Sequence, residues 1–97
     1  MTGGGPAGPP PDATVIVYGR PGCHLCEDAT SVIEAVRQRV PFRLEQRDIE
    51  SDDAWFARYL ERIPVVELDG VVVFELFVDA SRLERLLVER EWRVARR

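Results

Sequence analysis

A strand pattern that passes directly into a helix pattern constrains the fold of this chain more than any other feature. Residues 14–18 (Thr-Val-Ile-Val-Tyr) are all β-branched or aromatic, which is typical of a strand buried on both faces of a sheet. After a Gly/Pro break at residues 19–22, apolar residues recur along one face of a predicted helix over about residues 23–39. These residues are Leu25, Ala29, Val32, Ile33, Val36 and Val40. A strand followed at once by a crossover helix predicts an α/β fold.

The middle of the chain predicts an edge strand and a second, shorter helix. Residues 42–48 alternate between apolar and polar at first and then become polar, as edge strands do. Ser51 or Asp52 is expected to cap the helix that follows, because either side chain can accept a hydrogen bond from its first turn. The apolar face of this helix is expected to comprise Phe56, Tyr59, Leu60 and Ile63.

The last third of the chain predicts a β-hairpin followed by a helix. Asp69-Gly70 separates the apolar runs 65–68 and 71–76, and it favours a type I′ turn, in which both central residues have positive φ. A two-residue loop predicts two apolar cross-strand pairs, Leu68 with Val71 and Val66 with Val73. Asp79 is expected to cap the final helix. The residues expected on the buried face of that helix are Ala80, Leu83, Leu86, Leu87 and Val94.

The full order β-α-β-α-β-β-α predicts a four-stranded mixed sheet flanked by helices. We expect this domain to occupy residues 13–97. Residues 1–12 are rich in glycine and proline and have no apolar face to bury, so they are expected to form a flexible tail.

Composition excludes several classes of function. The 97 residues, 45% of them hydrophobic and 31% charged, are enough for one small globular domain. A net charge of -4 and a pI near 5.0 argue against a nucleic-acid partner. No apolar run approaches the ~20 residues that span a bilayer, and the N-terminus lacks the pattern of a signal peptide. We therefore expect a cytoplasmic protein without a membrane partner, and we expect it to be a monomer.

The chain has two cysteines, Cys23 and Cys26, where the first strand passes into the first helix. Cys23 lies at the predicted helix N-terminus, where free N–H groups and the positive end of the helix dipole stabilise a thiolate. Cys26 lies one turn further on, close enough to form a disulfide but with its sulfur directed more toward the protein. The spacing therefore predicts that Cys23 attacks and Cys26 resolves the mixed disulfide.

The residues around the cysteines do not predict a metal site, and they are expected to lower the pKa of the Cys23 thiol only modestly. A zinc site usually needs four ligands, and His24 is the only other candidate. His24 is either a cation that helps to hold the thiolate or a solvent-facing spacer. Glu27 and Asp28 oppose a thiolate electrostatically, so the pKa of Cys23 is expected to fall only modestly.

The cysteines stand in a longer pattern that resembles a known family. The segment from Val17 to Cys26 is Val-Tyr-Gly-Arg-Pro-Gly-Cys-His-Leu-Cys, followed by Ile63-Pro-Val-Val66 and by Asp69-Gly70. This order resembles the glutaredoxin-like proteins of the thioredoxin superfamily. It is most similar to the small bacterial branch with a C-x-L-C-E/D-x-A motif, here Cys23-His-Leu-Cys-Glu-Asp-Ala29. The resemblance covers about residues 14–88 and implies a thioredoxin-like fold of the glutaredoxin type.

The resemblance implies a substrate-binding edge beside the cysteines. Pro64 matches the proline that these proteins hold in a cis peptide next to the disulfide, and the backbone of the preceding residue, here Ile63, pairs with an extended substrate. A proline at strand entry also removes a hydrogen-bond donor. Arg20 occupies the place of a lysine near the thiol and the glutathione carboxylate. Without the resemblance, Pro64 would end a helix in trans and Arg20 would be an exposed loop charge.

One stretch departs from the glutaredoxin pattern. In that family a Gly-Gly pair followed by an aspartate binds glutathione, and residues 74–79 here are Phe-Glu-Leu-Phe-Val-Asp. Asp79 fits the aspartate, although it also fits a helix cap. Glu75 and Leu76 replace the glycines, so their side chains are expected to crowd the approach and Glu75 to repel the anionic tripeptide. We therefore expect weak glutathione binding.

Three aromatic residues are candidates for the wall of a substrate groove. Tyr18 ends the first strand just before the motif and is expected to lie near the thiols. Trp55 and Tyr59 are four residues apart on one helix face, so they are expected to touch each other. They line either the groove or the rim of the core.

These features favour a dithiol thiol–disulfide oxidoreductase, in which Cys23 and Cys26 reduce protein or glutathione mixed disulfides. Its partner would be a disulfide-bearing protein or glutathione. No tightly bound cofactor is expected, and glutathione or a flavoprotein reductase would supply the electrons. Two alternatives remain open: a metal or iron–sulfur carrier in which a dimer shares thiolates, and a redox-inert interaction module that keeps only the fold.

Overall fold

The structure is a computed structural model that describes residues 13–95, with side chains described as far as residue 89. The predicted tail at 1–12 lies outside the described residues. The elements are β1 (Thr14–Gly19), α1 (His24–Arg37), β2 (Arg43–Asp48), the short 3-10 helix η1 (Ile49–Ser51), α2 (Asp53–Tyr59), β3 (Val65–Leu68), β4 (Val71–Glu75) and α3 (Ala80–Ala95). The predicted order of strands and α-helices is confirmed.

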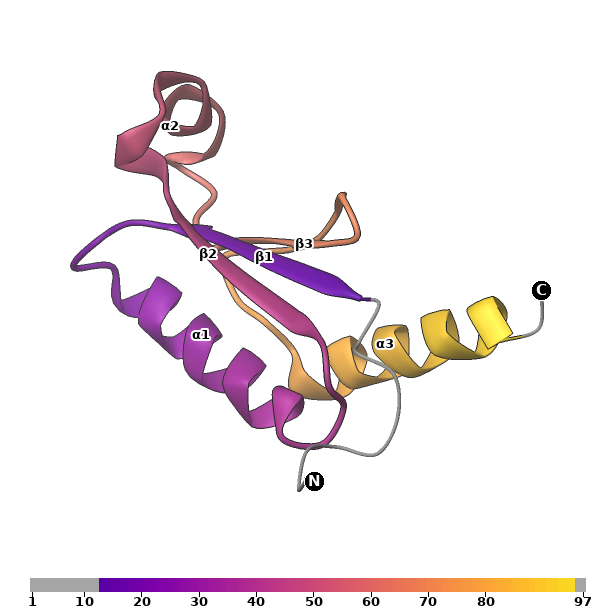
Figure 1. Ribbon diagram of the computed structural model, residues 1–97. Coiled ribbons are helices and arrows are strands. Elements are labelled where there is room, and N and C mark those ends of the chain that lie inside the picture. Colours follow the sequence, from indigo (N-terminus) through magenta and orange to yellow (C-terminus); the bar gives the residue numbers. More distant parts are fainter. Residues whose placement is uncertain (1–12, 96–97) are drawn as a thin grey trace, which may run out of the picture.

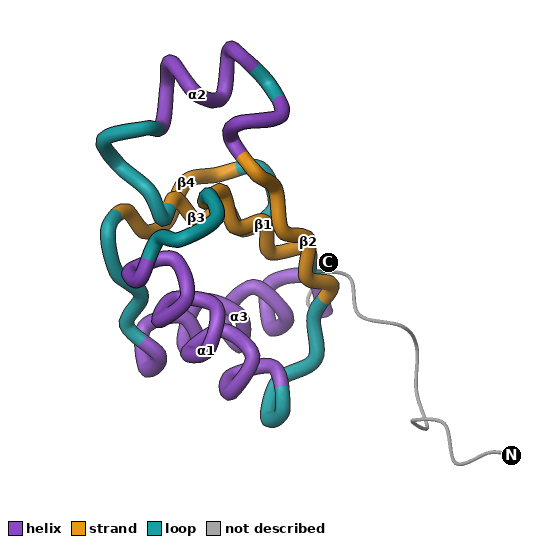
Figure 2. The backbone as a smooth tube through the Cα atoms, turned by 90° about the vertical axis from the view of Figure 1, so that its left-hand side faces the viewer, coloured by secondary structure: helices purple, strands orange, loops and turns teal. Residues whose placement is uncertain are grey.

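The four strands form one mixed sheet in the order β2-β1-β3-β4. β1 pairs in parallel with β2 and antiparallel with β3, and β3 pairs antiparallel with β4. Figure 1 shows α1 and α3 together on one face of the sheet and α2 beyond the other face. The view in Figure 2, turned by 90°, shows the same layers. The predicted α/β fold with a four-stranded mixed sheet is therefore confirmed.

The hairpin turn has the predicted type, but the strand register differs beyond its first pair. Asp69 and Gly70 have φ values of 52° and 86°, as a type I′ turn requires. Leu68 lies opposite Val71 as predicted. The predicted pairing of Val66 with Val73 is wrong, because a bulge between Val66 and Glu67 places Val66 opposite Phe74. Because of the bulge, the β4 side chains that follow it lie on the opposite face of the sheet from the one expected without it. Phe74 thereby packs in the core.

The helix starts follow from side chains that accept hydrogen bonds from the first turn. Asp52 caps α2, since its Oδ1 accepts from the N–H groups of Ala54 and Trp55 at 2.9 and 3.0 Å. Ser51, the other predicted cap, belongs to η1 instead. Phe56 was expected on the apolar face of α2, but it is exposed.

The third helix also begins as predicted. Asp79 Oδ1 accepts a hydrogen bond from the N–H of Arg82 at 3.2 Å, which confirms its role as the cap of α3. Leu83 and Leu87 are fully buried on the core side of this helix. Ala80 and Leu86 pack against the same core, and the Val94 side chain lies outside the described residues.

The buried residues form two clusters. The larger lies between the sheet and the helix layer of α1 and α3, and it contains Val15, Val17, Ile33, Val36, Val66, Phe74, Leu83 and Leu87 among others. The smaller lies at the end of the sheet where β1 passes into α1. We call it the disulfide-end cluster, and it consists of Tyr18, Cys26, Ile49, Tyr59, Ile63 and Val65. One of the two cysteines is therefore part of the core.

The two edge strands of the sheet differ in character. β2 presents exposed charged side chains, among them Arg43, Glu45 and Asp48. β4 presents Val71 and Val72, which are 63% and 42% exposed. The edge strand predicted at 42–48 is confirmed at one side of the sheet, and the hairpin strand forms the other.

Within residues 13–95, no helix is long and apolar enough to span a membrane.

Candidate active site

The two cysteines form a disulfide at the start of α1, where the sequence predicts a redox pair. Their Cα atoms are 5.2 Å apart. Cys23 is the cap of the helix, and its Sγ accepts a hydrogen bond from the N–H of Cys26 at 3.1 Å. Cys26 is 7% exposed, whereas Cys23 is partly exposed. The sulfur nearest to solvent therefore also receives an N–H of the first helical turn, which favours its thiolate once the pair is reduced.

Gly19, the last residue of β1, packs directly against the buried cysteine. A Cβ atom on Gly19 would lie 3.0 Å from the Sγ of Cys26 and 3.1 Å from its Cβ. Only a residue without a side chain lets the strand and the first turn of α1 approach this closely. Sequence reasoning did not identify Gly19 as a site residue, and its only signal was a glycine that ends a strand before the motif.

The predicted cis peptide bond between Ile63 and Pro64 is confirmed. Both residues are buried, and Ile63 belongs to the disulfide-end cluster together with Cys26. Cys23 packs against the same cluster. Ile63, one of the two residues that the resemblance places next to the disulfide, therefore shares a packed cluster with Cys26. The role of both residues in substrate binding stays a prediction.

The stretch that departs from the glutaredoxin pattern has an unusual backbone. Leu76 has a φ of 75°, a left-handed conformation that leucine rarely adopts. Its N–H donates to two carbonyl oxygens, that of Pro64 at 2.9 Å and that of Arg62 at 3.2 Å. The neighbouring Glu75 accepts a hydrogen bond from Arg62 Nη1 at 2.9 Å. A leucine therefore occupies a backbone position suited to glycine, next to Pro64.

Tyr18 lies in the disulfide-end cluster, as expected for a residue near the thiols. Its ring contacts those of Trp55 and Tyr59, with centroids 5.5 and 4.7 Å away. Its hydroxyl accepts a hydrogen bond from Arg47 Nη1 at 3.1 Å. Burial raises the pKa of Tyr18, and the negative charge of Glu67 raises it further. Trp55 and Tyr59 therefore both contact Tyr18, with Tyr59 buried in the disulfide-end cluster and Trp55 packed against it.

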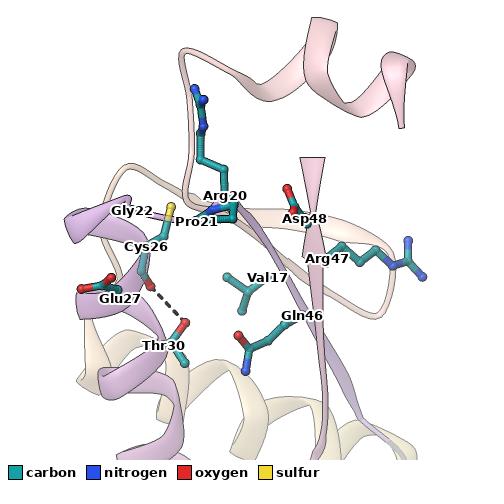
Figure 3. A pocket seen from close by; sticks show the side chains of 11 residues that line it. Val17, Arg20, Pro21, Gly22, Cys26, Glu27, Thr30, Gln46, Arg47 and Asp48 are labelled. Atoms are coloured by element: carbon teal, nitrogen blue, oxygen red, sulfur yellow. Dashed lines mark hydrogen bonds between the residues drawn. The ribbon is translucent and has the colours of Figure 1, made fainter. Parts of the chain in front are cut away.

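A cleft of about 490 Å³ opens beside Cys26, and residues of β1, α1, β2 and the loop between β1 and α1 line it. Its lining includes Cys26, Thr30, Gln46 and Asp48, and Figure 3 shows these side chains around the opening. Arg20 also lines the cleft, and Figure 3 shows its side chain extending away from the Cys26 sulfur.

The remaining predicted site residues have local partners. Arg20 pairs with Glu50 of η1, with Nη2 and Oε2 2.7 Å apart, and its guanidinium lies 5.9 Å from the ring of Phe56. Asp79 caps α3, and binding of substrate by Arg20 or Asp79 stays a prediction. His24 has a side chain that is 94% exposed, with Nδ1 3.7 Å from a carboxylate oxygen of Glu27. This geometry matches the spacer role.

No group of three or more histidine, cysteine, aspartate or glutamate side chains within residues 13–95 is arranged to hold a metal ion.

Comparison with known proteins gives consistent results. A family model described as "Glutaredoxin-like domain (DUF836)" matches residues 14–88. A curated relative, the "Glutaredoxin-like protein YDR286C homolog" of Dictyostelium discoideum, is 32% identical over 72 residues, which cover 68% of this chain and 67% of that protein.

Solved structures share the fold. Protein Ne2328 from Nitrosomonas europaea superposes with a TM-score of 0.69 at 25% identity, covering 84% of this chain and 96% of that one. Protein XcR50 from X. campestris gives a TM-score of 0.66 at 28% identity, with 77% and 96% covered. A mutant thioredoxin from Halobacterium salinarum gives 0.57 at 21% identity over 79% and 73%, a likeness of fold alone. With its cysteine pair, its cis-proline and these matches, the chain belongs to the glutaredoxin-like (DUF836) family of the thioredoxin superfamily.

Proposed function

We propose that this protein is a dithiol thiol–disulfide oxidoreductase that reduces protein or glutathione mixed disulfides through Cys23 and Cys26. One observation carries the proposal: the two sulfurs lie within bonding distance in the first turn of α1, and the more exposed one receives an N–H of that turn. Family membership supports a redox role for such a pair. The compartment that we propose is the reducing cytoplasm, where a dithiol of this kind is regenerated.

The proposed reaction has two exchange steps. The thiolate of Cys23 attacks a sulfur of the substrate disulfide, forms a mixed disulfide and releases one substrate thiolate. Cys26 then loses its proton and attacks the Cys23 sulfur, which releases the second substrate thiolate and closes the Cys23–Cys26 disulfide. Two electrons pass from the protein dithiol to the substrate. A thiol reductant, glutathione or the dithiol of another protein, returns them in a further pair of exchanges.

The protein supplies position and charge rather than a cofactor. The first-turn N–H groups of α1 lower the energy of a thiolate at Cys23. Burial disfavours a thiolate at Cys26, so this sulfur reacts mainly within the mixed disulfide, where its target is already adjacent. We propose the same division of roles that the sequence predicts.

Single serine substitutions test the roles of the two cysteines. The reduced protein is mixed with a mixed-disulfide substrate, and intact masses are followed over time. Wild type is expected to end as the internal disulfide, whereas Cys26→Ser should accumulate the substrate adduct on Cys23 because resolution is lost. Cys23→Ser should form adducts at least about tenfold more slowly, since the remaining thiol is buried.

The reverse pattern, rapid adduct formation on Cys26 in Cys23→Ser, would contradict the assignment. A reduced wild-type protein that exchanges with no disulfide would contradict the proposed activity and favour a redox-inert interaction module.

A further inference from the structure

We propose that Leu76 determines substrate specificity, selecting apolar and basic polypeptide segments over glutathione at the Cys23–Cys26 site. This inference rests on the proposed dithiol activity and names the class of substrate on which it acts.

Leu76 lies at the same end of the sheet as the disulfide. Tyr18 of β1 pairs with Val65 of β3, and Val65 pairs with Glu75 of β4. The next residues along β1 and β4 are Gly19 and Leu76. At a strand spacing of about 4.8 Å, their backbones are separated by about 10 Å, two strands across the sheet.

Pro64 links this position to the cysteines. The N–H of Leu76 donates to the Pro64 carbonyl at 2.9 Å, and the residue before Pro64 packs in the disulfide-end cluster with Cys26. Gly19 is in contact with the Cys26 sulfur. A substrate disulfide that reacts at Cys23 therefore brings its neighbouring residues close to Leu76.

The folded protein gains little from a leucine at this position. The φ of 75° disfavours any residue with a Cβ, and the side chain is 49% exposed, so burial offsets little of that cost. Two hydrogen bonds of its N–H, to Arg62 and Pro64, hold the backbone in this conformation. A strained and exposed apolar side chain beside a reactive centre is the pattern of a residue that contacts another molecule.

Two more exposed apolar side chains belong to residues that adjoin the cysteines or Leu76 in the chain. Leu25, between the two cysteines in the sequence, is 50% exposed, and Phe77, next to Leu76, is 69% exposed. We call Leu25, Leu76 and Phe77 the apolar rim. Side chains of an extended polypeptide on either side of its reacting cysteine can pack on this rim, whereas glutathione carries no apolar side chain to do so.

The charged side chains in this part of the protein also favour a polypeptide over glutathione. Arg20 and Arg62 are already engaged with Glu50 and Glu75, at 2.7 and 2.9 Å. Among the described residues, Asp28 in the first part of α1 is exposed and has no ion-pair partner. Glutathione carries two carboxylates and a net negative charge, so it meets engaged arginines and an unpaired carboxylate. A basic segment is attracted instead.

The experiment compares two mixed disulfides that share one chromogenic aromatic leaving thiol. One probe is a hexapeptide whose cysteine is flanked by leucine and arginine, and the other is glutathione. The reduced protein attacks the peptide or glutathione sulfur through Cys23 and releases the aromatic thiolate, whose absorbance gives the rate of the first step. Cys26 then releases the bound thiol, so each turnover oxidises one protein dithiol and reduces one probe disulfide.

We expect wild type to react with the peptide probe about tenfold faster than with the glutathione probe, from the area that the rim can bury. Leu76→Gly suits the backbone and removes the side chain, and Leu76→Asn tolerates the same φ with a polar group. Both should bring the ratio of rates below about threefold. Val71→Ser is the matched control, since Val71 is 63% exposed at the opposite end of the sheet, and it should leave the ratio unchanged.

A wild-type ratio near one, or a ratio that neither Leu76 variant lowers, would overturn the specificity role while leaving the dithiol activity intact. A wild-type protein that reacts with neither probe would instead contradict the proposed function. A ratio that falls equally in Val71→Ser would assign the preference to general surface hydrophobicity and would also overturn the role of Leu76.

Discussion

At the scale of single residues, two glycines beside the disulfide are required for different physical reasons. Gly19 is required by space, because a Cβ would lie 3.0 Å from the Cys26 sulfur. Gly22 has open space around it, but its φ of 79° disfavours any other residue. The first constraint involves a side chain that changes its covalent state in the proposed reaction, whereas the second belongs to the backbone alone.

Gly19→Ala should therefore lower the free energy of unfolding of the oxidised protein by about 1–3 kcal/mol through overpacking. Reduction frees the Cys26 sulfur to move, so the loss should be smaller in the dithiol form. Gly22→Ala, the control, should cost about 1–2 kcal/mol in both forms, because its cost is a backbone strain. Urea unfolding of each variant with and without reductant measures these changes. An equal loss for Gly19→Ala in both redox forms would contradict the steric explanation.

Residue-level features were predictable where they depend on local sequence. The cysteine pair and the cap at Asp79 each follow from a short motif and its position, whereas the cis bond at Pro64 was implied by the resemblance to the glutaredoxin-like proteins. The contact of Gly19 with Cys26 depends on how closely a strand and a helix approach, which no local pattern records. The pairing of Arg20 with Glu50 was missed for a related reason, since it joins two segments that only the fold brings together.

At the scale of secondary-structure elements, Tyr18 connects the sheet to α2. It is held by the Arg47 guanidinium from β2 and by the rings of Trp55 and Tyr59 from α2. The Arg47 guanidinium also lies 5.2 Å from the Trp55 ring. A neutral hydroxyl at Tyr18 suits this buried position, because a phenolate would lose solvation and would face the charge of Glu67.

This arrangement predicts a loss of stability in alkaline solution. The pKa of Tyr18 is raised above its ordinary value of 10.0, so above that pH the unfolded chain loses the phenolic proton before the folded protein does. The stabilisation is complete below pH 10.0 and is lost as the pH rises through the folded-state pKa. Tyr18→Phe should remove this component and cost about 1 kcal/mol near neutrality, through the lost hydrogen bond to Arg47.

Urea unfolding of wild type and Tyr18→Phe on both sides of pH 10.0 tests the slope. The difference in tyrosinate absorbance between the two proteins gives the Tyr18 midpoint directly. A midpoint at or below 10.0 would show that the hydrogen bond from Arg47 outweighs burial.

Element order was predictable because the apolar periodicity and the Asp-Gly turn are strong local signals. The register of β4 was not, because residues 71–74 are Val-Val-Val-Phe and any phase of the strand presents apolar residues to the core. The bulged register is favoured over the others only because it buries the large Phe74 side chain in the core. Phe56 was misplaced because α2 has seven residues and covers only one end of the sheet, so its buried stripe is narrow.

At the scale of the whole molecule, the core is divided into two clusters, one of which contains a cysteine of the disulfide. The large cluster joins the sheet to α1 and α3, and the disulfide-end cluster joins it to α2 and the cysteines. Ile33 and Ile49 are both fully buried, one in each cluster. Truncation of either removes the same atoms from the core, so their effects on stability and on the reaction can be compared directly.

Ile33→Val and Ile49→Val should each lower the free energy of unfolding by about 1 kcal/mol. The losses should add in the double variant to within about 0.5 kcal/mol, because the residues share no cluster. The rate of exchange at Cys23 should fall in Ile49→Val and stay near wild type in Ile33→Val. Denaturation curves and single-turnover kinetics provide the two readouts. A rate loss confined to Ile33→Val would contradict the division of the core.

The two edges of the sheet differ in whether they can pair with a strand of another molecule. The alternating charges along β2 oppose a further strand, whereas Val71 and Val72 leave the β4 edge open to one. The described sheet therefore has one edge, β4, that can pair with a strand of another molecule. If two chains joined along β4, the free sheet edges that their described residues leave would be the charged β2 edges, so association through this sheet would end at a pair and would not extend into a filament.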